Sequence, residues 1–375
     1  MTTIAAYDPK PTVIWEMTRA CDLACRNCPN IDHETPSPLE LWTYEAYKTI
    51  DEIASVHPRR FVMTGGDPLR RKDLGQIVDY ACRRGLDPAL TLSPTAITSE
   101  ESIRSLRRHG LKRVIVPLDD AAAEGHDAWR GVAGSFRTTL HLIGTALTAG
   151  LKVEVNTLVT RRNADHLRRM HEQLVTLSIA SWNLYFLVPR PGPQEAEMLF
   201  AADVEQLFEV VHILRAMQPM TIRVFEAPHE RRYEIQIAAA RREAQLDAMF
   251  DTTHWADFSG YAAVASEAPE EVIFITHSGE VWPDELLPIV AGNVRYSPLR
   301  AIHRHGAIFA SLRDRTNLKG KCGCCEFRSI CGGSRARAYA MTGDPFAADP
   351  LCAYQPGALP LTPYGLPASC RGATQ

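Results

Sequence analysis

Short apolar segments alternate with amphipathic segments from residue 12 to about residue 225. The short segments are rich in Val, Ile and Leu and show little polar alternation, which is typical of parallel strands buried on both faces. The longer segments between them carry apolar residues at helical spacing. This pattern predicts six strands, at residues 12–17, 60–64, 89–92, 113–118, 152–158 and 182–187.

Several of the intervening helices have readable ends. Ser37, Pro38 and Glu40 combine an N-cap residue, a proline in the first turn and a capping-box glutamate, which together predict a helix start. Glycines at helix C-termini predict where three other helices end. These glycines are Gly85, Gly110 and Gly150. Six strand–helix units predict an α/β fold with a parallel sheet, and the periodicity alone leaves open a barrel or a doubly wound sheet.

The alternation stops after residue 225. Residues 231–250 read as a charged amphipathic helix, and residues 272–283 as a hairpin that turns at Ser278-Gly279. A further helix is expected near residues 298–312, before a cysteine-rich segment. The chain is therefore divided into a barrel (1–225), a helical connector (226–270), a small C-terminal Cys-rich domain (271–355) and a Pro/Gly-rich tail (356–375).

Composition narrows the class of protein. The chain has 375 residues, of which 45% are hydrophobic and 23% charged, as in an ordinary globular protein. A net charge of −3 argues against nucleic-acid binding, and the absence of a long apolar run argues against a membrane partner. Ten cysteines without a secretory signal predict reduced, metal-bound thiols and a cytoplasmic location.

Three cysteines follow the first predicted strand at the spacing C-x3-C-x2-C. They are Cys21, Cys25 and Cys28. Three thiolates on one short loop can bind three irons of a cubane [4Fe-4S] cluster and leave the fourth iron without a protein ligand. A structural zinc site would need a fourth ligand nearby, and the sequence offers no second cysteine pair there. An open iron can bind a reactant.

A second cysteine group lies near the C-terminus, as C-x2-C-x5-C with one more cysteine further on. These four are Cys322, Cys325, Cys331 and Cys352. Four thiolates fit a fully ligated [4Fe-4S] cluster, although a zinc site has the same ligand count. Cys324 exceeds the number of ligands needed, Cys370 lies in the tail, and Cys82 reads as a small core residue.

The N-terminal cysteine loop resembles the signature of the radical S-adenosylmethionine (radical SAM) superfamily, and the whole chain resembles its branch with a C-terminal SPASM or twitch auxiliary-cluster domain. Motifs such as Cys331-Gly-Gly-Ser334 and Ala291-Gly-Asn-Val294 are similar to those of the alternative-haem and denitrifier-haem group. The resemblance implies a partial (β/α)6 TIM-type barrel. It also implies a SAM cosubstrate, a radical SAM cluster and an electron donor such as flavodoxin or ferredoxin.

The resemblance also assigns residues to the SAM site. The turn with Gly65, Gly66 and Asp67 matches the family's GGEP position, where backbone groups approach the SAM ammonium. Asp119 at the end of the fourth strand would accept from ribose hydroxyls or orient an arginine. Arg130 would pair with the SAM carboxylate, a substrate acid or a structural partner. Asn156 would donate to SAM or satisfy a polar group inside the barrel.

The sequence departs from the family pattern at a few positions. Asn27 replaces the usual aromatic residue or His near the adenine, and Pro117 replaces a serine before Asp119. Ser334 stands where the haem group has a cysteine. A cysteine that would hold a second auxiliary cluster is replaced within Val281-Trp-Pro-Asp284, so a single auxiliary cluster is expected, with Asp284 as a residue that could face it.

Three substrate classes fit this pattern. A small tetrapyrrole-type carboxylate would need basic residues at the barrel mouth, for which Arg190, Arg231 and Arg232 are candidates. A peptide precursor is a common substrate of the branch, although the first cysteine at position 21 leaves little room for a leader-binding domain. Transfer of a 3-amino-3-carboxypropyl group to a soft acceptor such as trivalent arsenic is a third class. A non-catalytic iron–sulfur carrier and a zinc-binding interaction module are the rivals outside this enzyme class.

Overall fold

The computed structural model describes residues 10–23, 25–26, 28, 35–95, 97–190, 193–217, 220–249 and 271–357. Contacts divide the chain into two compact units. Unit 1 contains residues 1–184, 219–223 and 270–310, and unit 2 contains residues 185–218, 224–269 and 311–375. The expectations for Asn27, for Cys370 and for residues 250–270 of the predicted connector lie outside the described residues.

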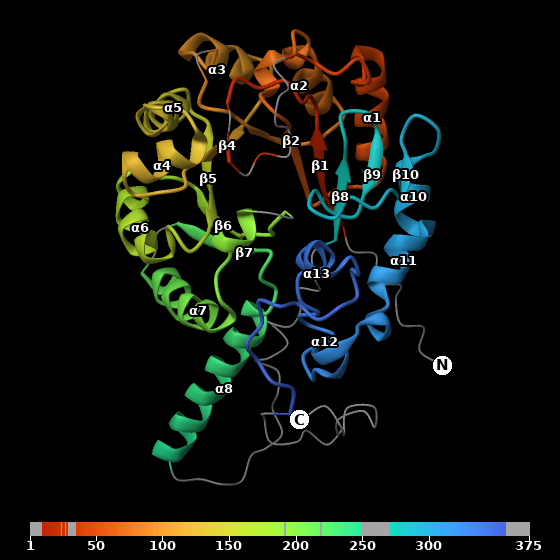
Figure 1. Cartoon of the computed structure of the whole chain (residues 1–375). Helices are drawn as coiled ribbons and strands as arrows, with labels where there is room; N and C mark the ends of the chain where they lie inside the picture. Colours follow the sequence, from red (N-terminus) through yellow and green to blue (C-terminus); the bar gives the residue numbers. More distant parts are fainter. Residues whose placement is uncertain are drawn as a thin grey trace. The chain divides into compact units, whose positions relative to one another are not determined.

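A ten-stranded sheet has the order β10-β9-β8-β1-β2-β3-β4-β5-β6-β7 (Figure 1). Strands β1 to β5 and the pair β1–β8 are parallel, and β8, β9 and β10 form an antiparallel meander. The strands are β1 (Thr12–Glu16), β2 (Arg60–Thr64), β3 (Pro88–Thr91), β4 (Arg113–Pro117), β5 (Lys152–Val159), β6 (Ser181–Phe186), β7 (Thr221–Phe225), β8 (Val272–Ile275), β9 (Glu280–Trp282) and β10 (Gly292–Asn293). The six predicted strands are confirmed, and the fold is the partial parallel barrel that the family resemblance implied.

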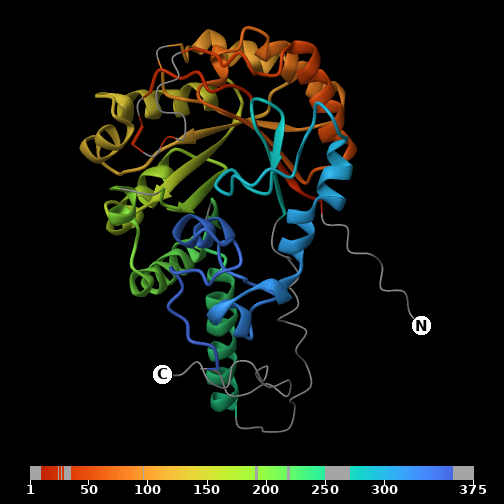
Figure 2. The same cartoon turned by 45° about the vertical axis from the view of Figure 1, so that its right-hand side comes forward.

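Strands β7 and β10 and the pairing of β8 with β1 were not predicted from the sequence. The hairpin at residues 272–283 forms as expected and turns at Gly279, whose φ is 85°. Its first strand, β8, pairs in parallel with β1, with Val272 opposite Thr12 (Figure 2). This segment therefore extends the barrel sheet of unit 1.

Helices of unit 1 follow the strands in the expected alternation. They are α1 (Thr43–Ser55), α2 (Leu74–Arg83), α3 (Glu100–Arg108), α4 (Ala123–Arg130), α5 (Ser135–Thr148), α6 (Leu167–Thr176) and α10 (Leu299–His305). The helix predicted at residues 298–312 is broken at Gly306, and its second part is α11 (Ala307–Arg313). Helices of unit 2 are α7 (Ala201–Ala216), α8 (Glu230–Met249), α12 (Gly320–Cys324) and α13 (Arg335–Thr342).

Helix ends agree with the sequence at the glycines but not at Ser37. Gly85, Gly110 and Gly150 adopt left-handed φ values of 80°, 97° and 77° after their helices, as predicted. The predicted helix start at Ser37 is wrong, because α1 begins at Thr43, where Glu45 accepts a hydrogen bond from the N-cap backbone. Glu40 bonds elsewhere, as described below.

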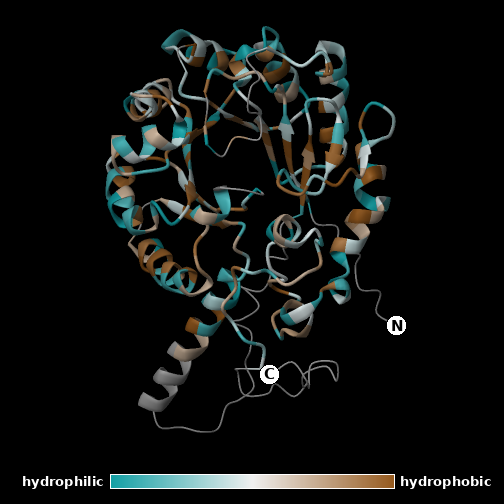
Figure 3. Cartoon of the chain, in the orientation of Figure 1, coloured by the Kyte–Doolittle hydropathy of each residue, from teal (hydrophilic) through white to brown (hydrophobic). Residues whose placement is uncertain are grey.

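The core of unit 1 lies between the sheet and its helices. Side chains such as Trp15, Met63, Leu90 and Val114 are fully buried. Hydrophobic residues concentrate on the strands, and hydrophilic residues on the outer sides of the helices (Figure 3). Among the described residues, no helix combines the length and the apolar character needed to cross a membrane.

Candidate functional site: two cysteine centres

The cysteine loop, the glycine turn and Asp119 follow the carboxyl ends of parallel strands, while Asn156 lies within β5 and Arg130 ends α4. β1 and β2 are in register, with Glu16 opposite Thr64, so the cysteine loop and the glycine turn begin side by side. β4 and β5 are also paired, with Pro117 opposite Asn156, which places Asn156 beside the segment leading to Asp119. In parallel α/β folds this edge carries the active site.

The glycine turn packs directly on the backbone that leads to Cys21. The Gly66 N–H donates to Thr18 O at 2.8 Å, and the Asp67 N–H donates to Ala20 O at 2.7 Å. A Cβ atom on Gly65 would lie 2.4 Å from Thr18 O, and one on Gly66 would lie 2.4 Å from Ala20 O. Both positions therefore require glycine because side chains would push the cysteine loop away.

Glu40 fixes the same backbone from the other side. Its Oε1 accepts from the Thr18 hydroxyl at 2.6 Å and from the Arg19 N–H at 3.2 Å. The same oxygen accepts from the Ser37 N–H at 3.2 Å. The capping pattern predicted for Ser37 and Glu40 therefore forms in a turn and not at a helix start. The Glu40 carboxylate holds the backbone that leads into the cysteine loop.

Two sulfur atoms of the cysteine loop accept hydrogen bonds, one from the loop backbone and one from Arg130 of α4. The Leu23 N–H donates to Cys21 Sγ at 3.4 Å, and Arg130 Nη1 donates to Cys25 Sγ at 3.7 Å. The Cys28 N–H donates to Cys25 O at 3.0 Å, which closes the loop. Burial raises the pKa of Cys21, so its thiolate needs positive charge nearby, as an iron cluster would supply.

Arg130 joins Cys25 to the end of β4. Its guanidinium forms an ion pair with the buried Asp119 carboxylate, whose Oδ1 also accepts from the Leu158 N–H at 3.0 Å. The buried His126 accepts from the Asp119 N–H at 3.1 Å, and burial lowers the pKa of His126 to about 4. Of the alternatives open for Arg130 from the sequence, the structural ion pair is present.

Asp67 and Asn156 have different surroundings. Asp67 is fully buried, and its carboxylate accepts from the Thr95 hydroxyl at 2.6 Å and from the Leu69 N–H at 3.1 Å. It therefore caps the turn after β2. Asn156 Oδ1 accepts from Asn183 Nδ2 at 2.8 Å, which orients the Asn156 amide.

The second group of cysteines surrounds one cavity in unit 2. All four predicted ligands line it, together with Phe327, Gly333 and Tyr354. Within the described residues, no three His, Cys, Asp or Glu side chains converge on a single-ion position. A cubane spreads its ligating sulfurs more widely than one ion does, because each thiolate binds a different iron. The thiols are reduced and are Cys322, Cys325, Cys331 and Cys352.

Backbone N–H groups point at these sulfurs. The Asp349 N–H donates to Cys322 Sγ at 3.4 Å, and the Gly333 N–H donates to Cys331 Sγ at 3.3 Å. Burial raises the pKa values of Cys325 and Cys331 to about 12. Because buried thiols ionise readily only next to a cation, the cavity fits the cluster expected from the sequence.

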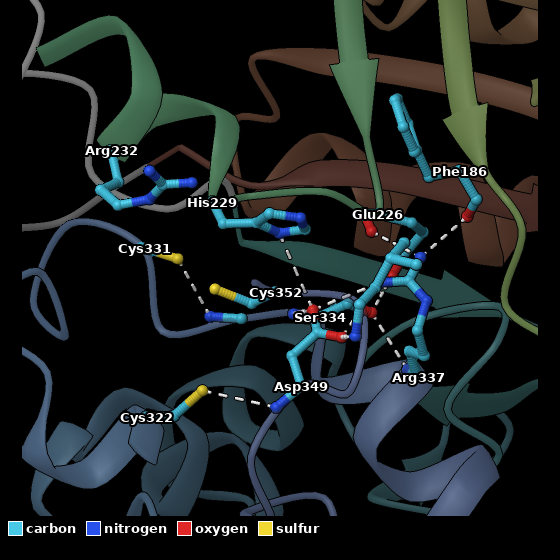
Figure 4. A network of polar contacts seen from close by, with 12 residues as sticks. Phe186, Glu226, His229, Arg232, Cys322, Cys331, Ser334, Arg337, Asp349 and Cys352 are labelled. Carbon is cyan, nitrogen blue, oxygen red and sulfur yellow. Dashed lines mark hydrogen bonds and ion pairs between the residues drawn. The ribbon is translucent and has the colours of Figure 1, made fainter. Parts of the chain in front are cut away.

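A buried ion pair holds the cysteine segments of unit 2 (Figure 4). Arg337 and Asp349 are fully buried, and Arg337 Nη1 lies 3.2 Å from Asp349 Oδ2. Arg337 also donates to the carbonyls of Phe186, Leu187 and Glu226 at 3.0, 3.2 and 2.7 Å. The Asp349 backbone N–H donates to Cys322 Sγ, and the Asp349 carbonyl accepts from the Cys352 N–H at 3.3 Å. Because the ion pair holds Asp349 in place, it positions two predicted ligands.

Ser334 belongs to the same network. Its hydroxyl bonds to the Glu226 carboxylate, whose pKa is raised by burial. Its N–H donates to Asp349 Oδ2 at 2.7 Å. The residue that replaces the family's cysteine is therefore committed to a hydrogen-bond network.

Sequence reasoning missed His229 and misplaced Arg232. Arg232 was a candidate for the barrel mouth, but it is buried, pairs with Glu205 and lies 4.9 Å from the centre of the Tyr354 ring. His229 is fully buried and lines the cavity. A lone histidine outside any motif gives no sequence signal. Asp284, in unit 1, accepts from the Leu286 N–H at 2.7 Å.

Residues 15–174 match the model of the radical SAM superfamily. An AdoMet-dependent heme synthase of Methanosarcina barkeri is 33% identical, covering 94% of this chain and 99% of its own. A pre-heme d1 synthase of Dinoroseobacter shibae is 28% identical over 93% of this chain and 87% of its own.

A peptide cyclase and a solved structure are also similar to this chain. A PqqA peptide cyclase of Methylocella silvestris is 28% identical over 91% of this chain and 87% of its own. The crystal structure of Streptococcus suis SuiB superposes with a TM-score of 0.67 at 14% identity, covering 92% of this chain and 78% of SuiB.

Replacing Gly66 tests the contact between the glycine turn and the cysteine loop. We expect Gly66→Ala to destabilise the protein by about 1–3 kcal/mol, because its methyl group meets Ala20 O. It should also lower the iron content of anaerobically reconstituted protein. Thermal unfolding and iron analysis measure the two effects. Gly144→Ala is the control, since its methyl group would enter open space in α5 and stabilise by about 0.5–1 kcal/mol. Equal behaviour of the two variants would contradict the packing argument.

Replacing Arg337 tests the buried ion pair. Arg337→Met should cost about 3–5 kcal/mol, because it leaves the Asp349 carboxylate buried without its partner. Denaturant unfolding measures this loss. Arg83→Met removes an exposed pair with Asp79 and should cost less than about 0.5 kcal/mol. The double variant Arg337→Met, Asp349→Leu should recover part of the loss; no recovery would mean that the pair is not the cause.

Proposed function

The chain belongs to the radical SAM superfamily, and on that premise we propose that it cleaves SAM reductively in order to modify a carboxylate-bearing tetrapyrrole. The protein is a radical SAM enzyme. The observation that carries the choice of substrate is the 33% identity to a heme synthase across almost the full length of both chains. A peptide cyclase is 28% identical over a similar span. Because this identity is lower than that to the heme synthase, we favour a tetrapyrrole substrate over a peptide.

Cys21, Cys25 and Cys28 are the proposed ligands of the first cluster, with one iron left for SAM. When bound, the reduced cluster supplies the electron that breaks a carbon–sulfur bond of the sulfonium. Arg130 places positive charge 3.7 Å from Cys25 Sγ and ties the loop to Asp119. This charge balances that of the thiolate and holds the loop in one geometry.

Gly65, Gly66 and Asn156 are the proposed contacts to SAM. The glycines keep the turn close to the cysteine loop, and the Gly66 carbonyl accepts from the Ser93 hydroxyl at 2.9 Å. Asn156 presents an amide whose orientation is set by Asn183. Asp67 acts through the turn that it caps, since its carboxylate is already bonded to Thr95 and Leu69.

The cavity of unit 2 is the proposed site of one auxiliary [4Fe-4S] cluster. Its support is the ring of thiols and the N–H groups directed at Cys322 and Cys331. We also propose the division into barrel, connector, auxiliary-cluster domain and tail. The proposed partners are a small-molecule substrate and an electron donor of the flavodoxin or ferredoxin type, and the proposed location is the cytoplasm. Iron and zinc analysis after anaerobic reconstitution separates the cluster from a zinc site.

The proposed reaction can be tested directly with an iron porphyrin that carries propionate groups. Reconstituted protein, dithionite, SAM and this porphyrin should give 5′-deoxyadenosine, and the porphyrin mass should fall as propionate groups are altered. The same porphyrin with esterified propionates is the matched control and should not react. Nucleoside release without any change in the porphyrin would contradict the proposal. Methylthioadenosine as the nucleoside product would also contradict it and would favour aminocarboxypropyl transfer.

Cysteine variants locate the chemistry. Cys25→Ala should abolish SAM cleavage, because it removes a ligand from the first cluster. Cys82→Ala changes a thiol on α2 that lies near Gly110 O, outside both cysteine groups, and should retain full activity. Nucleoside products measured by chromatography decide the comparison. Residual cleavage in Cys25→Ala comparable to that of the parent would mean that the loop does not hold the reactive cluster.

A further inference from the structure

We propose that His229 donates a ring N–H hydrogen bond to the sulfur atoms of the auxiliary cluster and thereby raises its reduction potential. This inference rests on the proposed auxiliary cluster. His229 precedes α8 and lines the cavity together with all four predicted ligands. Figure 4 shows its ring above the segment with Cys352 and Asp349.

The ring of His229 lacks the partners that a buried histidine requires. It is fully buried, and neither ring nitrogen has a hydrogen-bond partner in the part of the chain that the structure describes. Phe208 packs edge-on against the ring at 5.0 Å, which fixes its plane without satisfying its polar atoms. Buried polar groups in native proteins are almost always bonded, so this ring implies an acceptor inside the cavity.

Asp349 is the nearest candidate acceptor, but its capacity is filled. His229 Nδ1 lies 4.0 Å from Asp349 Oδ2, which is too long for a hydrogen bond. That carboxylate already accepts from the Ser334 and Leu351 N–H groups at 2.7 and 3.0 Å and from Arg337. A carboxylate offers about four acceptor positions, and these bonds use them.

The other polar side chains that line the cavity are bonded to protein groups. Lys321 donates to Cys352 O, Arg328 donates to Gly323 O at 3.3 Å, and the Tyr354 hydroxyl donates to Glu326. Arg232 is held by Glu205 and Gln236. Arg232 Nε also lacks a partner in the described part of the chain, but its guanidinium is anchored by two acceptors, whereas neither nitrogen of the His229 ring has a partner. His229 is therefore the lining side chain whose polar atoms are all left for whatever fills the ring of thiols.

A hydrogen bond to sulfur stabilises the more negative, reduced form of a cluster more than the oxidised form. Its removal therefore lowers the reduction potential. Backbone N–H groups already serve Cys322 and Cys331, and these bonds remain when a side chain is changed. The contribution of His229 can be separated from theirs by substitution.

The test uses full-length protein in which Cys21, Cys25 and Cys28 are all changed to Ala, so that only the auxiliary cluster is loaded. Reductive titration followed by electron paramagnetic resonance gives its potential. His229→Phe should reduce the equilibrium constant for reduction at least tenfold, a fall of 59 mV for a one-electron couple. His229→Gln keeps an N–H donor and should restore part of the lost potential.

Two outcomes would contradict different parts of the proposal. A parent protein without iron in the cavity would overturn the proposed cluster. Equal potentials in an iron-loaded parent and an iron-loaded His229→Phe variant would overturn only the role of His229.

A matched histidine controls for the loss of any buried imidazole. His171 on α6 of unit 1 is also buried, with Nε2 unpartnered among the described residues, and does not line the cysteine cavity. His171→Phe should leave the potential unchanged, and a shift equal to that of His229→Phe would overturn the proposal.

A measurement on the unsubstituted ring covers the case in which the variants lose their iron. In the triple-Ala parent exchanged into D2O, pulsed electron–nuclear spectroscopy should detect an exchangeable deuteron near the reduced cluster and a weak coupling to histidine nitrogen. A strong nitrogen coupling would mean that His229 ligates iron, and no deuteron would mean that it donates no bond; either result overturns the proposal.

Discussion

The close backbone contact between residues 18–20 and the turn at residues 65–67 is the interaction on which the first cysteine centre depends. Two N–H groups of the turn, from Gly66 and Asp67, bond to carbonyls of the cysteine segment at 2.8 and 2.7 Å. The contact is possible because Gly65 and Gly66 lack side chains. It anchors a loop that carries only three thiolates, so the protein itself, and not a fourth ligand, has to fix the loop. Glu40 and Arg130 complete that support from two other elements.

The second centre is held by a different means. Cys322 lies in the short helix α12, while Cys325, Cys331 and Cys352 lie outside helices and strands. The buried pair of Arg337 and Asp349 connects these segments to the end of β6. Such a pair carries a high desolvation cost and is retained where one geometry is needed. Here the geometry fixed is that of Cys322 and Cys352, whose backbone or sulfur atoms bond to Asp349. Unlike the first centre, this one has a predicted protein ligand for every corner of a cluster.

Local patterns in the sequence predicted the strands β1 to β6, the helix-closing glycines and both cysteine groups. Buried apolar runs and ligand spacings involve residues that are close together in the sequence, so a single sequence displays them. Pairing of β8 with β1 joins residues about 260 positions apart, as with Val272 and Thr12, and leaves no local signature. The helix start at Ser37 was misread because the same residues make a turn whose carboxylate bonds to Thr18. His229 and Arg337 acquire their roles from burial alone, which a single sequence does not display.

The proposed function requires that SAM bind an iron that Cys21, Cys25 and Cys28 leave without a protein ligand. The most direct test is electron–nuclear double resonance on the dithionite-reduced protein with SAM carrying 15N in its amino group. We expect a nitrogen coupling large enough for direct bonding between the SAM amino group and the cluster, and we expect it to be lost when Cys25 is changed to Ala. A cluster that shows no coupling to bound SAM, or that carries a fourth protein ligand at that iron, would contradict it.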